Sequence, residues 1–243
     1  MIPPILHQTW KIKKVPDWAT DWHASWRKYN PELQFMWWTD KMNRHLVKTY
    51  APWFLQTYDA LPVHIQRVDA VRYLILYLYG GIYVDLDFEC YKNIGRFRKY
   101  DLVFSYSGNA PYITNCIMMS VPGHPVWLKM LRAIQKAPAK QWYELKSYYV
   151  LRSTGPVMLD RVVNQWIDMQ DTKVRVLPAK YFFPFNMFQK YKQFRTFPQA
   201  FGAHHHMCTW TNDHNLLKGT GIFLLVVIGC LVLALSQSWH HKK

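Results

Sequence analysis

From Arg67 to Asp87 the chain reads RVDAVRYLILYLYGGIYVDLD, and this stretch decides the fold. Residues 60–79 predict a long apolar helix that ends before the glycine pair. Gly80 and Gly81 allow a sharp turn, because glycine adopts backbone angles that other residues avoid. Residues 82–87 predict the end of a strand with both aspartates on one side, since side chains alternate along an extended chain.

The two aspartates, Asp85 and Asp87, predict a metal site. Two negative charges at the end of an apolar strand repel each other, and a divalent cation relieves that repulsion. Oxygen ligands suit Mg²⁺ or Mn²⁺, and both ions bind diphosphates. Asp69 and Arg72 share a face of the preceding helix, where an arginine suits a phosphate or a ribose. The alternative for this pair is a structural ion pair at the helix–strand corner.

Strands and helices alternate along the rest of the chain, which predicts an α/β domain with a mostly parallel sheet. In such sheets ligands bind at the carboxyl ends of the strands. The expected helices cover residues 16–29, 39–50, 60–79, 125–135 and 155–166. The expected strands lie near residues 1–10, 34–38, 82–87, 101–105, 115–120 and 174–178.

The end of the chain has a different composition, because residues 219–239 contain no charged side chain. Roughly 20 helical residues, at about 1.5 Å each, cross the ~30 Å hydrocarbon core of a bilayer. We therefore expect a domain at 1–215, a transmembrane helix at 219–239 and a basic tail at 240–243. The alternative is a buried core helix or strand.

The N-terminal sequence does not predict a secretory signal, since residues 1–10 lack a basic region followed by an apolar core. We therefore expect a single-pass membrane protein with a C-terminal span and the domain at 1–215 in the cytosol. The lumen of the Golgi or of the endoplasmic reticulum is the alternative, because the distribution of positive charge does not decide the orientation.

Composition and net charge limit the classes of protein to which this chain could belong. Half of the 243 residues are apolar and 19% are charged, which excludes an intrinsically disordered chain. The formal net charge of +15 attracts polyanions, anionic membranes or phosphorylated small molecules. One hypothesis is therefore a non-enzymatic, membrane-tethered protein that binds nucleic acid or anionic lipid. Four acids within residues 69–89 argue against it, because a groove for a polyanion would not collect negative charge.

Several blocks of the sequence, in order, resemble glycosyltransferase family 32, and most closely its inositol phosphorylceramide mannosyltransferases and the yeast initiating α-1,6-mannosyltransferases. The Arg67–Asp87 stretch resembles the family's Asp-x-Asp block. The likeness covers roughly residues 2–212. The other blocks are residues 5–10, 30–40, 115–125, 153–156 and 204–210.

The resemblance implies a GT-A fold, which is a Rossmann-like domain that binds nucleotide sugars, and sugar transfer with retention of configuration. It implies catalytic roles for Asp85, Asp87 and Arg72. A divalent metal, with Mn²⁺ favoured over Mg²⁺, would be held by Asp85, Asp87 and one histidine of residues 204–206, best His204. The implied donor-binding residues are Trp10, which would stack on the base, and Asp69, Arg72, Tyr83, Asp85, Asn115 and Trp210.

The function we expect from this resemblance is hexose transfer, with mannose favoured, from GDP-mannose or a UDP-hexose. The acceptor we favour is lipid-linked, such as an inositol phosphoceramide, because a membrane span confines the site near lipids. A polysaccharide, glycoprotein or lipopolysaccharide acceptor is the alternative. No nucleic-acid partner is expected.

Overall fold

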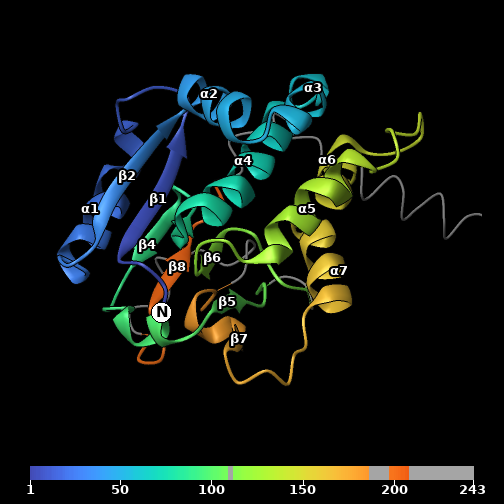
Figure 1. The fold of residues 1–243 in the computed structure, drawn as a ribbon. Helices are drawn as coiled ribbons and strands as arrows, with labels where there is room; N and C mark the ends of the chain where they lie inside the picture. Colours follow the sequence, from blue (N-terminus) through green and yellow to red (C-terminus); the bar gives the residue numbers. More distant parts are fainter. Residues whose placement is uncertain (109–111, 186–196, 208–243) are drawn as a thin grey trace, which may run out of the picture. The chain divides into compact units, whose positions relative to one another are not determined.

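A six-stranded sheet in the order β2-β1-β3-β6-β5-β7 runs through the molecule (Figure 1). Five strands point the same way, and β6 runs antiparallel to both of its neighbours, β3 and β5. The expected α/β domain is thus confirmed, with a mixed sheet in which one strand is reversed. The strands are β1 (Ile5–Trp10), β2 (Gln34–Thr39), β3 (Gly81–Val84), β5 (Leu102–Ser105), β6 (Ile117–Ser120) and β7 (Val174–Leu177).

Helices cover both faces of this sheet. Side chains of α2, α3, α4, α5 and α7 form one buried cluster with Tyr83, Phe104 and Met118 of the sheet. On the other face, Trp26 of α1 packs with Ile82 and Val84, whose side chains alternate with that of Tyr83 along β3. The helices are α1 (Thr20–Tyr29), α2 (Asp40–Tyr50), α3 (Pro52–Ala60), α4 (His64–Tyr79), α5 (Pro125–Gln135), α6 (Lys146–Ser153) and α7 (Pro156–Trp166). Single 3-10 turns lie at Asp17–Ala19, Gly95–Lys99 and Ala179–Tyr181.

Three expected element boundaries are wrong. The helix predicted at 60–79 begins at His64, because Pro62 disfavours helical angles in the residue before it and separates α4 from α3. The helix predicted from residue 16 begins at Thr20, after a 3-10 turn. The strand predicted at 82–87 ends at Val84, so alternation along a strand does not place Asp85 and Asp87.

The turn between α4 and β3 requires both glycines. Gly80 and Gly81 have φ angles of 61° and 87°. A Cβ at Gly80 would lie 2.6 Å from the backbone nitrogen of Pro122, and one at Gly81 would lie 2.5 Å from the carbonyl oxygen of Ile5. The sharp turn predicted at this pair is therefore confirmed, and it places the end of β3 directly beside α4.

A second, two-stranded sheet joins distant parts of the chain. Its strands are β4 (Phe88–Cys90) and β8 (Gly202–His204), which run antiparallel. Phe88 pairs with His204, so the segment after the Asp-x-Asp motif lies beside the histidines near residue 204.

The computed structural model describes residues 1–108, 112–185 and 197–207. Within these ranges, no helix combines the length and apolarity needed to cross a membrane. The predicted span at 219–239 and the predicted donor-binding residue Trp210 lie outside the described residues.

Candidate active site

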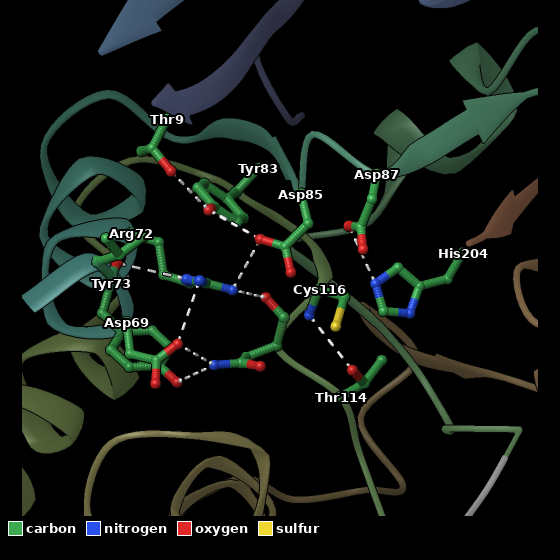
Figure 2. A network of polar contacts seen from close by, with 12 residues as sticks. Thr9, Asp69, Arg72, Tyr73, Tyr83, Asp85, Asp87, Thr114, Cys116 and His204 are labelled. Carbon is green, nitrogen blue, oxygen red and sulfur yellow. Dashed lines mark hydrogen bonds and ion pairs between the residues drawn. The ribbon is translucent and has the colours of Figure 1, made fainter. Parts of the chain in front are cut away.

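The candidate site lies at the carboxyl end of β3 and draws on four parts of the chain. Helix α4 contributes Asp69 and Arg72, and β3 with the turn after it contributes Tyr83, Asp85 and Asp87. The loop before β6 contributes Asn115 and Cys116, and β8 contributes His204 (Figure 2). Side chains that are far apart in sequence therefore meet at the end of the sheet where ligands bind in α/β folds.

Arg72 is the centre of a buried network. One terminal nitrogen lies 3.1 Å from Asp69 Oδ1 and the other lies 3.1 Å from Asp85 Oδ1. Its guanidinium also donates to the carbonyl oxygen of Asn115 at 2.8 Å and lies 4.6 Å from the centre of the Tyr83 ring. Burial opposes the charge, but Asp85, Tyr83 and Asp69 together raise the pKa of Arg72 well above its usual value.

Asp69 completes the network on the side of α4. Its carboxylate accepts hydrogen bonds from Asn115 Nδ2 and from Thr154 Oγ1, both at 2.9 Å. Burial raises the pKa of Asp69 to about 6, although Arg72 and these hydrogen bonds act in the opposite direction. The ion pair given above as the alternative for Asp69 and Arg72 is present, and both residues also contact Asn115.

Asp85 is the member of the network that reaches solvent. The Tyr83 hydroxyl donates to its Oδ1 at 2.9 Å and lies 3.1 Å from Thr9 Oγ1. The side chain of Asp85 is 22% exposed, whereas that of Arg72 is 2% exposed. Arg72, expected to face a phosphate, is instead enclosed in this conformation and pairs with Asp85.

Asp87 has different partners from Asp85. Its Oδ1 lies 3.1 Å from His204 Nε2, and its Oδ2 accepts a hydrogen bond from the backbone of Met207 at 2.9 Å. Burial disfavours the charged carboxylate, but His204 and the hydrogen bonds lower the pKa of Asp87 to about 2. Burial likewise opposes protonation of His204, and Asp87 raises its pKa well above the usual value.

His204 connects the two aspartates. Single ligand atoms of Asp85, Cys116 and His204 all lie within 4.8 Å of one another. Asp87 lies in contact with the same histidine. The predicted set of Asp85, Asp87 and His204 is therefore gathered at one place, with the turn after β3 rather than strand alternation as the cause.

Cys116 was not expected at this site. The four cysteines are scattered and show no ligand spacing, so the sequence offered no direct signal for it. An indirect signal existed, because Cys116 directly follows Asn115, a residue expected to bind the donor. Its thiol is an additional ligand atom beside the carboxylates.

The small sheet determines which histidine of the triplet joins the site. His204 is the last residue of β8 and stacks on Phe88 with ring centres 5.3 Å apart. His205 contacts Glu89 at 3.0 Å and stacks on Trp22 with ring centres 4.1 Å apart. His204 Nδ1 is buried and has no hydrogen-bond partner among residues 1–108, 112–185 and 197–207.

Trp10 lies at the last position of β1, one residue after Thr9, whose hydroxyl contacts Tyr83. Its ring meets Trp18 edge to face with centres 5.6 Å apart. Trp10 is half-buried, lies at the same end of the sheet as Asp85, and has Lys11 Nζ 5.7 Å from its ring centre. Its role in stacking on a base stays a prediction.

Comparisons with known proteins support a sugar transferase. The model of the family described as glycosyltransferase sugar-binding region containing DXD motif matches residues 16–105. Inositol phosphoceramide mannosyltransferase 3 of Schizosaccharomyces pombe is 34% identical over 172 residues, covering 71% of this chain and 48% of that protein. Mannosyl phosphorylinositol ceramide synthase CSH1 of Saccharomyces cerevisiae is 34% identical over 186 residues, covering 74% of this chain and 49% of that protein. This chain therefore spans about half the length of the curated relatives it matches.

A solved structure shares the fold. The PaToxG glycosyltransferase matches with a TM-score of 0.51 and 18% identity, covering 71% of this chain and 72% of that chain. The mixed sheet and this likeness define a GT-A-like α/β fold. The match of the family model to residues 16–105 and the relatives from the two yeasts confirm the resemblance to glycosyltransferase family 32.

Proposed function

We propose that this chain transfers a hexose, with mannose favoured, from a nucleotide-diphosphate sugar to a lipid-linked acceptor such as an inositol phosphoceramide. The observation that carries the proposal is the meeting of Asp85, Asp87 and His204 at the carboxyl end of β3, beside the enclosed Arg72. The names of the relatives from the two yeasts support the choice of sugar and of acceptor. GDP-mannose is the donor we favour, and a UDP-hexose is the alternative.

The donor atoms at the site fit a divalent cation. Asp85, Asp87 and His204 would hold it, and the Asp87–His204 contact of 3.1 Å brings a carboxylate and an imidazole into position to share one ion. Carboxylates with one imidazole favour Mn²⁺, and Mg²⁺ is the alternative. A bound cation would supply positive charge where the departing diphosphate develops negative charge.

The chain's own residues prepare the donor side of the site. Arg72 and Tyr83 both hold Oδ1 of Asp85, so this carboxylate is oriented before any ligand arrives. Its exposed part would then accept hydrogen bonds from ribose or sugar hydroxyls. Trp10 would stack on the base, while Asp69 and Asn115 would shape the floor of the sugar pocket. Preorganised groups lower the barrier because little reorganisation remains during the reaction.

Retention of configuration is the stereochemical outcome we propose. The acceptor hydroxyl would attack the anomeric carbon on the face that the diphosphate leaves. Its proton would pass to an oxygen of the departing phosphate. The product sugar would therefore keep the anomeric configuration of the donor, which NMR of the product measures directly.

A membrane anchor is also part of the proposal. The uncharged segment at 219–239 would span the bilayer once and leave the catalytic domain in the cytosol, with the Golgi or endoplasmic reticulum lumen as the alternative. Protease protection of the domain in sealed vesicles distinguishes these orientations. An anchored site favours a lipid acceptor over a polysaccharide, glycoprotein or lipopolysaccharide, because it raises the local concentration of lipid.

Asp87→Asn provides the decisive test. With Mn²⁺ and a panel of nucleotide sugars, we expect the full chain to transfer mannose from GDP-mannose to inositol phosphoceramide. Asp87→Asn removes a charge that faces His204 and should lower kcat by ~100-fold or more. Donor hydrolysis without an acceptor should fall equally, because the change acts on the departing diphosphate.

The matched control is Asp168→Asn, which removes an exposed carboxylate remote from the site. This variant should leave the rates of sugar transfer and of donor hydrolysis unchanged. Transfer that persists in excess EDTA would argue against the metal, and equal losses in the two variants would argue against a special role for Asp87.

A further inference from the structure

The connection between α5 and α6, together with the first turn of α6, carries large side chains that the described residues leave uncovered. Trp142 is 91% exposed and Tyr143 is 70% exposed, and Leu145 and Tyr148 are each 53% exposed. The connection projects beside α6 in Figure 1. A cluster of large apolar groups on a surface is typical of an interaction site, because exposure to water is unfavourable for each of them.

Arg152 fixes the base of this connection. Its guanidinium donates to the carbonyl oxygens of Pro138 and Ala139, both at 3.1 Å, and forms an ion pair with Glu144. Glu144 in turn accepts a hydrogen bond from the backbone of Gln141 at 3.2 Å. The segment that presents Trp142 is therefore held at both ends.

The same segment is positively charged. Residues 136–152 contain three lysines, one arginine and one acid, and the acid is the Glu144 that Arg152 neutralises. Lys136, Lys140 and Lys146 are exposed around the aromatic residues. Tryptophan and tyrosine with flanking lysines are typical of groups at a membrane–water interface. Each lysine near an anionic leaflet also gains from its negative surface potential.

We propose that the surface formed by Trp142, Tyr143, Leu145 and Tyr148, with Lys140 and Lys146 at its rim, docks on an anionic lipid bilayer. The aromatic rings enter the headgroup region, and the lysines contact lipid phosphates. The charge of the rim favours this occupant over a neutral apolar partner. The docking concerns the domain itself and goes beyond the proposed transfer reaction.

Helix α6 connects this surface to the candidate site. Its eight residues span about 12 Å. Directly after it, Thr154 donates to Asp69 Oδ2, and Ser153 at its end accepts a hydrogen bond from Gln66 of α4. Docking would thus hold the site at short range from the bilayer surface, where the headgroup of a lipid acceptor lies.

Amide hydrogen exchange of the full chain tests the docking. The exchange rates are compared between vesicles of neutral phosphatidylcholine and vesicles that also contain phosphatidylserine. We expect amides at 139–148 to exchange at least about fivefold more slowly with phosphatidylserine, and the loop at 167–173 to serve as an unchanged internal control. Trp142→Ala should remove the protection. Lys140→Glu and Lys146→Glu should each weaken docking about fivefold, and high salt should act in the same direction.

The matched control is Trp166→Ala, which removes another half-exposed tryptophan, at the end of α7. It should leave protection at 139–148 intact. Equal exchange in neutral and anionic vesicles would overturn the inference, as would protection that persists in Trp142→Ala. Protection already present without lipid would assign the surface to a protein contact instead. Vesicle docking is measured without donor, so its failure is distinct from a failure of sugar transfer.

Discussion

The two halves of the candidate site are built in different ways. Around Arg72, charges and hydrogen bonds satisfy one another inside the protein, on a long helix and a central strand. Around His204, the contacts depend on β8, a three-residue strand, and Nδ1 of His204 is buried without a hydrogen-bond partner among the described residues. The groups of the Arg72 half satisfy one another, whereas the His204 half supplies the ligand atoms of the proposed metal site.

The contrast predicts that changes in one half mainly affect stability and that changes in the other half mainly affect activity. Changes in the Arg72 half should be measured mainly in unfolding, since they expose buried charge. Changes in the His204 half should be measured mainly in ligand binding and catalysis. Three experiments probe the difference, from the largest expected effect to the smallest.

Arg72→Met should have the largest effect on stability. It leaves Asp69 and Asp85 without their shared counter-charge, and breaking a buried ion pair costs about 3–5 kcal/mol. Urea denaturation measures this loss. Arg44→Met is the control, because Arg44 pairs with Asp59 at the surface and such pairs contribute less than about 1 kcal/mol. Similar losses in the two variants would contradict the distinction between the halves.

Acid should destabilise the turn that supports the Arg72 half. His7 contacts the carbonyl oxygen of Gly80 through Nε2 and accepts a hydrogen bond from Trp38 at Nδ1, so the neutral ring satisfies both nitrogens. Burial lowers its pKa from 6.5 to about 4. As the pH falls from 6.5 to 4, the unfolded chain takes up a proton that the folded chain does not. The contribution of His7 to stability should therefore fall by about 3 kcal/mol over this window.

His7→Gln provides the comparison for that pH dependence. Glutamine retains a donor and an acceptor but does not titrate. Urea denaturation between pH 7.5 and 4 should show a flatter profile for the variant than for the parent. Parallel profiles would mean that His7 is not the group responsible.

Cys116→Ser should have the smallest effect of the three changes, and the effect should be limited to the affinity for metal ions. Thiolate ligands favour soft cations, whereas Mn²⁺ prefers oxygen. We expect Cd²⁺ affinity to fall about tenfold, equivalent to about 1.4 kcal/mol, and Mn²⁺ affinity to change little. Thermal shift with each ion measures both values. Cys90→Ser, whose sulfur contacts Asn30 away from the ligand cluster, is the control, and an unchanged Cd²⁺ response in Cys116→Ser would remove the thiol from the site.

Local signals predicted much of the fold. The helix at Pro125–Gln135 was expected with these bounds, since a proline suits the first turn and the apolar spacing is helical. The turn at Gly80 and Gly81 was equally clear, because only glycine fits there. The reversed direction of β6 was missed, since direction depends on the path of the connecting loops rather than on the strand's own residues.

Spacing along the chain predicted the local contacts of the site, whereas the distant contacts were suggested by the family resemblance or were missed. Asp69 and Arg72 meet because they lie three residues apart on one helix. The pairing of Phe88 with His204 leaves no pattern in either short strand, so only the family resemblance suggested that histidine. Cys116 belongs to no cysteine motif, and only its position after Asn115 indicated a place near the site; the structure brings its thiol close to Asp85 and His204. Strand alternation failed to place Asp85 and Asp87 because β3 ends at Val84, before both aspartates.

The late position of β8 in the chain has a consequence during synthesis. The segment carrying Arg72 and Asp85 leaves the ribosome long before residues 202–204, and domains tend to fold from the N-terminus as they emerge. A nascent or prematurely terminated chain would thus contain the ion-pair scaffold but lack the imidazole that completes the ligand set. The proposed transfer reaction would therefore have to wait until β8 has paired with β4.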